Sequence, residues 1–151
     1  MPSKKKLRTE LRNDPYSEFV RSLEPIGLGL KECSSRFDRN VYSTIRKGDK
    51  AAVTEVAAKF ELRHLEPRFF DATATYKLTI KDNKTGKEGL RVECIFETHV
   101  HGAPRLERSM VMRFVDSGLD AMIWPYFRSL VQDLAAKMSI GRIYVPIFGK
   151  P

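Results

Sequence analysis

The chain has 151 residues, of which 42% are hydrophobic, a length and composition that suit one domain with its own core. Its formal net charge is +8, from 27 basic and 19 acidic side chains, which favours acidic or polyanionic partners. Because it lacks an apolar signal segment and a long apolar run, we expect a cytoplasmic protein that does not insert into a membrane.

The first residues are basic and polar, and much of the excess positive charge lies there, on Lys4, Lys5, Lys6, Arg8 and Arg12. A start of this kind is typical of a disordered tail and less often of a nucleic-acid-binding arm. We therefore predict a tail over residues 1–15 and a single domain over residues 16–151.

A short amphipathic helix and then a strand are predicted at the start of the domain. Apolar residues with helical spacing precede Pro25; they are Tyr16, Phe19, Val20 and Leu23. From Ile26 onward apolar residues alternate with Gly27 and Gly29, and a polar tract follows over residues 32–38. This pattern predicts a strand that is exposed on one side.

Residues 51–59 mix helix-forming alanines with strand-forming valines, so both structures remain open there. Beyond this segment we predict a strand over about residues 56–65. Strict alternation over residues 72–80 and 90–100 predicts two further strands. The turn-forming residues 82–86 join these two strands into an antiparallel hairpin.

One long apolar stripe with helical spacing dominates the C-terminal part; it comprises Leu119, Met122, Ile123, Tyr126, Phe127, Leu130, Val131, Leu134, Ala135 and Met138. Ser117 and Asp120 fit a capping box at the start of this helix, and Gly141 fits a stop signal. Pro125 predicts a kink within the helix. The apolar segment 143–148 at the end of the chain indicates an interface.

Residues 110–114 either continue the sheet or lead into the long helix. In both cases several strands precede a helix. This order is typical of an α+β domain whose antiparallel sheet is covered on one face.

His99 and His101 lie on the polar face of a predicted strand, and their imidazoles would point the same way. Two ligands alone do not make a metal site, so we favour a solvated face or a subunit contact. Glu97 and His99 as an acid–base pair lack a nucleophile or a third orienting group. We therefore predict no enzyme activity, no metal and no cofactor.

Cys33 and Cys94 are far apart in the sequence, and neither belongs to a Cys-x-x-Cys motif. A reducing cytosol would keep both as thiols. We interpret them as small packing residues.

Basic residues on the predicted sheet offer an alternative function; they are Arg63, Arg68, Lys77, Lys81, Lys84, Lys87 and Arg91. Nucleic-acid binding would also need outward-facing aromatic rings on which bases could stack. Tyr76 alternates with the apolar residues and would face the core. A basic nucleic-acid-binding or antitoxin-like interaction module is therefore the second hypothesis.

The co-linear order of several segments resembles the SecB-like protein-export chaperones. Residues 22–37 resemble the first strand of that family, and Trp124-Pro125-Tyr126-Phe127-Arg128 resembles its aromatic-Pro-Tyr-x-Arg signature. Residues 76–80 and 90–100 resemble its central hairpin, and residues 143–148 resemble its post-helix segment. Together the matches cover roughly residues 19–148.

The resemblance implies a four-stranded antiparallel sheet with a long C-terminal helix packed on one face, assembled as a dimer of dimers. Proteins of this family hold unfolded polypeptide clients without nucleotide or metal. A subgroup serves antitoxins of toxin–antitoxin systems. The outward face of the sheet would pair subunits, and the helices would lie between dimers.

Apolar or aromatic residues on poorly alternating segments or near the chain end are the predicted client-binding residues, with core or tetramer interface as the other interpretation. They are Leu28, Leu30, Phe37, Val41, Tyr42, Trp124, Tyr144, Ile147 and Phe148. Lys77, Lys81 and Arg91 are the predicted partner-binding residues. Family members that deliver cargo to the SecA motor are acidic, so we do not expect this basic chain to dock there.

Overall fold

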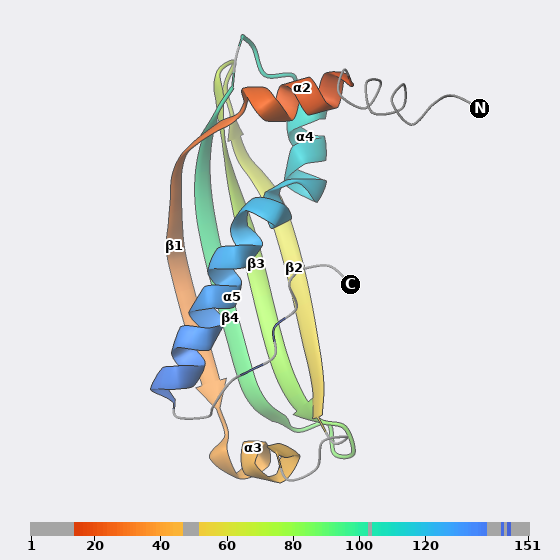
Figure 1. Cartoon of the computed structure of the whole chain (residues 1–151), viewed down its shortest axis with the longest axis vertical. Coiled ribbons are helices and arrows are strands. Elements are labelled where there is room, and N and C mark those ends of the chain that lie inside the picture. The colour runs from red at the N-terminus through yellow and green to blue at the C-terminus, as the bar shows by residue number, and fades with distance from the viewer. Residues whose placement is uncertain (1–13, 47–51, 103, 139–142, 144, 146–151) are drawn as a thin grey trace, which may run out of the picture.

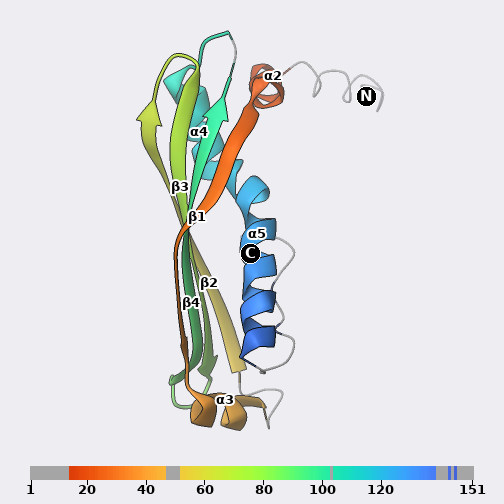
Figure 2. The ribbon, with the colours of Figure 1, turned by 90° about the vertical axis from the view of Figure 1, so that its left-hand side faces the viewer.

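Four long antiparallel strands form one sheet, and the long C-terminal helix lies across one of its faces (Figures 1 and 2). The computed structural model describes residues 14–46, 52–102, 104–138, 143 and 145. The strands are β1 (Glu24–Phe37), β2 (Ala52–Leu65), β3 (Phe69–Asp82) and β4 (Glu88–His101). The helices are α2 (Pro15–Ser22), α3 (Arg39–Arg46), α4 (Arg108–Ser117) and α5 (Leu119–Lys137). The predicted α+β class, sheet and long helix are confirmed.

The strand order is β1-β4-β3-β2, so β1 and β2, which are consecutive in the sequence, form opposite edges of the sheet. The β3–β4 connection is the predicted turn, where Gly86 adopts a φ of 70°. Helix α3 lies at the end of the sheet where β1 finishes (Figure 1). Its amide groups at Asn40 and Val41 donate to the Asp38 carboxylate, which begins the helix.

Alternation along β3 and β4 sorts their side chains between the core and the outward face. Tyr76 on β3 is at the centre of the core and contacts four aromatic rings, those of Phe60, Phe96, Trp124 and Phe127. The Phe127 ring stacks on the Tyr76 ring with centroids 4.9 Å apart. These contacts fix α5 on the sheet.

The apolar stripe of α5 divides into two rows with a spacing of four residues. The first row is fully buried and comprises Leu119, Ile123, Phe127, Val131 and Ala135. The second row is half-buried or exposed and comprises Met122, Tyr126, Leu130, Leu134 and Met138. The helix therefore carries more apolar surface than one sheet covers.

The predicted capping box at the start of the long helix is wrong, although α5 begins only two residues after Ser117. Ser117 is the last residue of α4, and its hydroxyl donates to the Arg113 carbonyl at 2.6 Å rather than capping α5. Asp120 instead accepts a hydrogen bond from the Tyr76 hydroxyl at 2.7 Å. Pro125 lies inside α5, as predicted, whereas the predicted stop signal Gly141 lies outside the described residues.

Other sequence predictions meet mixed outcomes. The ambiguous segment belongs to β2 from Ala52 onward, and residues 110–114 belong to α4. The polar tract 32–38 lies almost wholly in β1, which is largely exposed over its entire length. Helix α3 was not predicted. The predicted tail lies almost wholly outside the described residues, and α2 already begins at Pro15.

The two cysteines are neighbours across β1 and β4 and not separate packing residues. Cys94 is buried, as predicted, but Cys33 is exposed. The prediction for Cys33 is therefore wrong, because edge strand β1 leaves this side chain open to solvent. No helix in the part of the chain that the structure describes is long and apolar enough to cross a membrane.

Candidate functional site

An open apolar groove of about 290 Å³ lies between edge strand β1 and helix α5. Its apolar lining comes from both elements and from β4, and consists of Leu28, Leu30, Phe96, Tyr126 and Leu130. Gly29, Ser129 and Asp133 complete it and provide polar groups. The lining therefore combines a small number of polar groups with an apolar surface, as binding sites for apolar segments do.

Exposure increases from the interior of this groove to its rim. Phe96 is only 4% exposed, whereas its register partner Leu30 is 47% exposed and Tyr126 is 58% exposed. Leu30 and Tyr126 are among the few large apolar side chains that the structure leaves open to solvent. Grouped exposed apolar side chains of this kind mark an interaction site more often than scattered single ones do.

Strand β1 adds backbone groups to the groove. Within the described chain it pairs only with β4, so its other edge presents unpaired N–H and C=O groups. Gly29 leaves open space, since a Cβ atom built on it would meet nothing within 4 Å. An extended segment can therefore approach the backbone of β1 closely.

The predicted client-binding residues fall into separate places. Leu28 and Leu30 line the groove. Phe37 and Tyr42 contact each other in an edge-on arrangement, with ring centroids 5.4 Å apart, at the junction of β1 and α3. Val41 is half-buried on α3. The structure therefore does not bring all five residues into one site.

The prediction of Trp124 as a client-binding residue is corrected, because its side chain is 2% exposed and packs against Tyr76 and Phe127 in the core. Its side chain is not available to a client in this conformation. Tyr144, Ile147 and Phe148 lie outside the described residues. The neighbouring Ile143 and Val145 are buried, and their carbonyls accept hydrogen bonds from Gln132 and Arg128 of α5.

Sequence reasoning missed Phe96, Tyr126 and Leu130 as groove residues. The alternation of β4 places Phe96 on the core face, and the helical stripe predicts the same for the other two. For Tyr126 and Leu130, their place in the second row of α5 was the signal that could have distinguished them from the core residues of the first row.

The predicted partner-binding residues lie among acidic side chains. Lys81 pairs with Glu55 at 2.7 Å, and Arg91 pairs with Glu88 at 2.5 Å. The Arg91 hydrogen bond and the charges of Arg91, Lys77 and Lys81 lower the pKa of the Glu88 carboxyl. This part of the outward face is therefore of mixed charge rather than uniformly basic.

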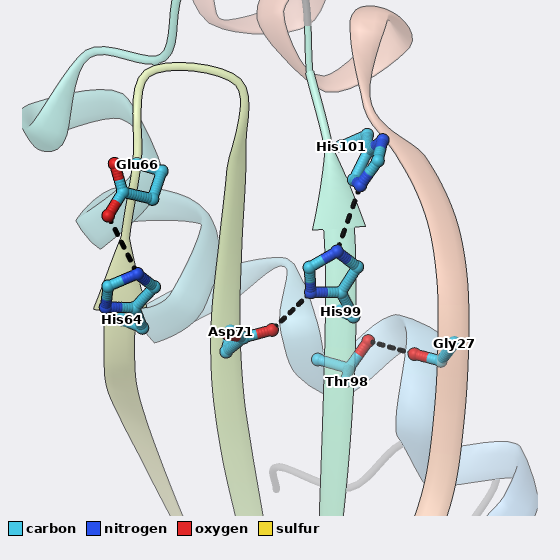
Figure 3. A network of polar contacts seen from close by, with 7 residues as sticks. All are labelled: Gly27, His64, Glu66, Asp71, Thr98, His99 and His101. Carbon is cyan, nitrogen blue, oxygen red and sulfur yellow. Dashed lines mark hydrogen bonds and ion pairs between the residues drawn. The ribbon is translucent and has the colours of Figure 1, made fainter.

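The three histidines of the chain lie on the outward face near the β2–β3 turn, with His64 on β2 and both His99 and His101 on β4 (Figure 3). Each of their rings contacts the Phe69 ring. His99 Nε2 lies 2.9 Å from His101 Nε2, so the two imidazoles meet as predicted. His99 Nδ1 contacts the Asp71 carboxylate, a partner that the sequence did not indicate. Within the described residues, no three or more His, Cys, Asp or Glu side chains are grouped so as to hold a metal ion.

No protein-family model matches the sequence, and no curated protein matches it either. Among solved structures, the chain is similar to the SecB-like chaperone Rv1957 of Mycobacterium tuberculosis, solved with a ChAD peptide from the antitoxin HigA1 (Rv1956). The TM-score is 0.69 at 11% identity, and the match covers 87% of this chain and 94% of that chain. The chain has the SecB-like fold.

A second solved structure, a protein of unknown function from Streptococcus agalactiae, gives a TM-score of 0.49 at 12% identity. That match covers 83% of this chain and 95% of that chain. In terms of the SecB-like fold, the groove lies where the first strand of the sheet meets the long helix.

Proposed function

We propose that this protein is an ATP-independent chaperone that holds non-native polypeptides in the groove between β1 and α5. The observation that carries the proposal is the open apolar lining beside the free edge of β1. The SecB-like fold supports the proposal, because a protein with this fold was solved with a peptide of an antitoxin. The clients would be export precursors or an antitoxin.

The proposed mechanism is passive. An extended polypeptide offers apolar side chains, which suit Leu30 and Tyr126, and unpaired backbone groups, which suit the edge of β1. Binding removes the unfolded client from its aggregation reactions by mass action, so no nucleotide is needed. The net charge of +8 would favour acidic clients.

Leu30→Ser and Tyr126→Ser test the groove. Because both side chains are exposed, the fold should persist, whereas each variant removes apolar surface worth about 1–2 kcal/mol to a bound client. We expect roughly tenfold weaker suppression of aggregation of an unfolded model protein per substitution. The assay is light scattering of the client with increasing chaperone.

Val20→Ser is the matched control, because Val20 is an exposed apolar side chain of α2 that does not line the groove. It should suppress aggregation as well as the unaltered protein does. If both groove variants also retain full activity with native circular dichroism, the client site is elsewhere. If added salt alone strongly weakens the suppression of aggregation, the interaction is mainly electrostatic, which would instead favour the nucleic-acid-binding alternative.

Lys77, Lys81 and Arg91 remain proposed partner-binding residues, and we do not expect docking to the SecA motor. Their acidic neighbours Glu55 and Glu88 restrict this proposal to partners that can meet a mixed surface.

A further inference from the structure

Cys33 on β1 and Cys94 on β4 face each other across the antiparallel ladder. Their Sγ atoms are 2.9 Å apart, which is roughly 1 Å more than an S–S bond of about 2.05 Å. Opposed residues of antiparallel strands have Cα atoms about 4.5 or 5.5 Å apart, and both values lie within the range found for disulfides. The backbone is therefore already placed for a bond between these two sulfur atoms.

The two thiols differ in access to solvent. Cys33 is exposed, and Cys94 is buried. Burial, together with the neighbouring Cys33, raises the pKa of the Cys94 thiol. Cys33 is thus the thiol that an external reagent reaches first, and Cys94 is placed to react only with Cys33.

We propose that Cys33 and Cys94 form a reversible disulfide by exchange with a low-molecular-weight disulfide, and that this bond tethers edge strand β1 to β4. The Cys33 thiolate attacks one sulfur of the reagent, whose S–S bond breaks and releases one thiolate. Cys94 then loses its proton and attacks Cys33 Sγ, which releases the second thiolate. Two protein thiols are oxidised, the reagent is reduced to two thiols, and these take up the two protons.

The position of this bond matters for β1. The Leu30–Phe96 register pair lines the groove. The Glu32–Ile95 pair separates it from the Cys33–Cys94 pair along the same two strands, with a bulge between Leu30 and Glu32. Within the described residues β1 is held in the sheet by β4 alone. A covalent link here would therefore hold the strand that forms one wall of the groove, whatever the groove binds.

The test incubates the full chain with oxidised glutathione, blocks free thiols with N-ethylmaleimide and measures intact mass and peptide linkage. We expect an internal Cys33–Cys94 disulfide without retained glutathione, and its reversal by excess reduced glutathione. Cys94→Ser should accumulate a glutathione adduct at Cys33. In Cys33→Ser, glutathione should react with the buried Cys94 at least tenfold more slowly than it reacts with Cys33 in Cys94→Ser.

Two results would overturn the proposal. One is an unaltered protein that keeps glutathione on Cys33 to the same extent as Cys94→Ser does, because Cys94 would then not reach Cys33. The same holds for an unaltered protein that does not react with oxidised glutathione at all. The other is an internal disulfide that leaves amide hydrogen exchange in residues 24–37 unchanged. The tether predicts several-fold slower exchange there in the oxidised protein, and the reduced protein provides the reference.

Discussion

Tyr76 combines a fully buried aromatic ring with a polar hydroxyl. The ring is surrounded by other aromatic rings, and the hydroxyl donates to the Asp120 carboxylate at 2.7 Å. Burial of the hydroxyl, and then its hydrogen bond to the negative Asp120, raise the pKa of Tyr76. The residue therefore links β3 to the first turn of α5 only while it is protonated.

Tyr76→Phe should reduce the free energy of unfolding at pH 8 by about 1.5–3 kcal/mol, as expected for a hydrogen bond to a charged group. Because folding raises the pKa of Tyr76, its contribution is complete below the ordinary tyrosine pKa of about 10 and decreases above it. The stability difference between the two proteins should therefore narrow above pH 10. Urea unfolding of both proteins at pH 8 and above pH 10 measures this difference. A difference that does not change with pH would contradict the proposed role of the Tyr76 hydroxyl.

The sequence predicted the direction of Tyr76 but not its partner. Alternation along β3 placed the ring in the core, because strand side chains point to opposite faces in turn. Asp120 was interpreted as a capping residue, since its contact depends on where α5 crosses the sheet. Sequence spacing carries no information on that crossing. The missed His99–Asp71 contact has another reason, since it depends on the register in which β3 and β4 pair.

At the scale of elements, Gly118 separates α4 from α5. A Cβ atom on Gly118 would lie 2.5 Å from Phe114 Cδ2, so the two helices meet at a point without room for a side chain. Phe114 is itself buried and contacts the Phe70 ring edge-on, with centroids 6.0 Å apart. It cannot move away without disturbing the core.

Gly118→Ala should therefore destabilise the protein by about 1–3 kcal/mol, the usual cost of overpacking. Gly118 has a φ of −99°, which alanine adopts freely, so the effect would come from the contact alone. Gly29→Ala is the matched control, since its Cβ would meet no atom within 4 Å. Thermal unfolding of Gly118→Ala and Gly29→Ala compares their stabilities. Equal melting temperatures of the two variants would refute the packing argument.

The strands were easier to predict than the helix ends. Alternation was strong in β3 and β4 because their two faces differ in burial, whereas the exposed β1 shows less of it. Helix α4 was not predicted as a separate helix, because the alternating Met110, Met112 and Phe114 suit a strand as well as a helix. Helix α3 was missed because its sequence is short and polar, although the Asp38 before it is a helix-capping residue.

At the scale of the whole molecule, the second row of α5 remains to be covered. Leu134 and Met138 extend this row beyond the groove residues Tyr126 and Leu130. An apolar row that its own sheet covers only in part is typical of helices that pack against another subunit. We therefore retain the expectation of a tetramer built as a dimer of dimers.

Leu134→Glu should dissociate the proposed tetramer into dimers, because the interface would have to bury an unpaired charge. Ala136→Glu places the same charge on an exposed position of α5 outside the row and should leave assembly unchanged. Sedimentation at micromolar concentration measures both variants. A monomeric unaltered protein would contradict the proposed assembly.

The strand order also bears on how the chain is synthesised. β1 leaves the ribosome before the other strands, yet its only partner in the described sheet, β4, is completed at His101. The β2–β3 and β3–β4 pairs can close locally, whereas β1 has to wait for a contact that is distant in sequence. Until then β1 is an extended segment with exposed Leu28 and Leu30. A nascent copy of this protein therefore has the chemistry of the polypeptides that the finished protein is proposed to hold.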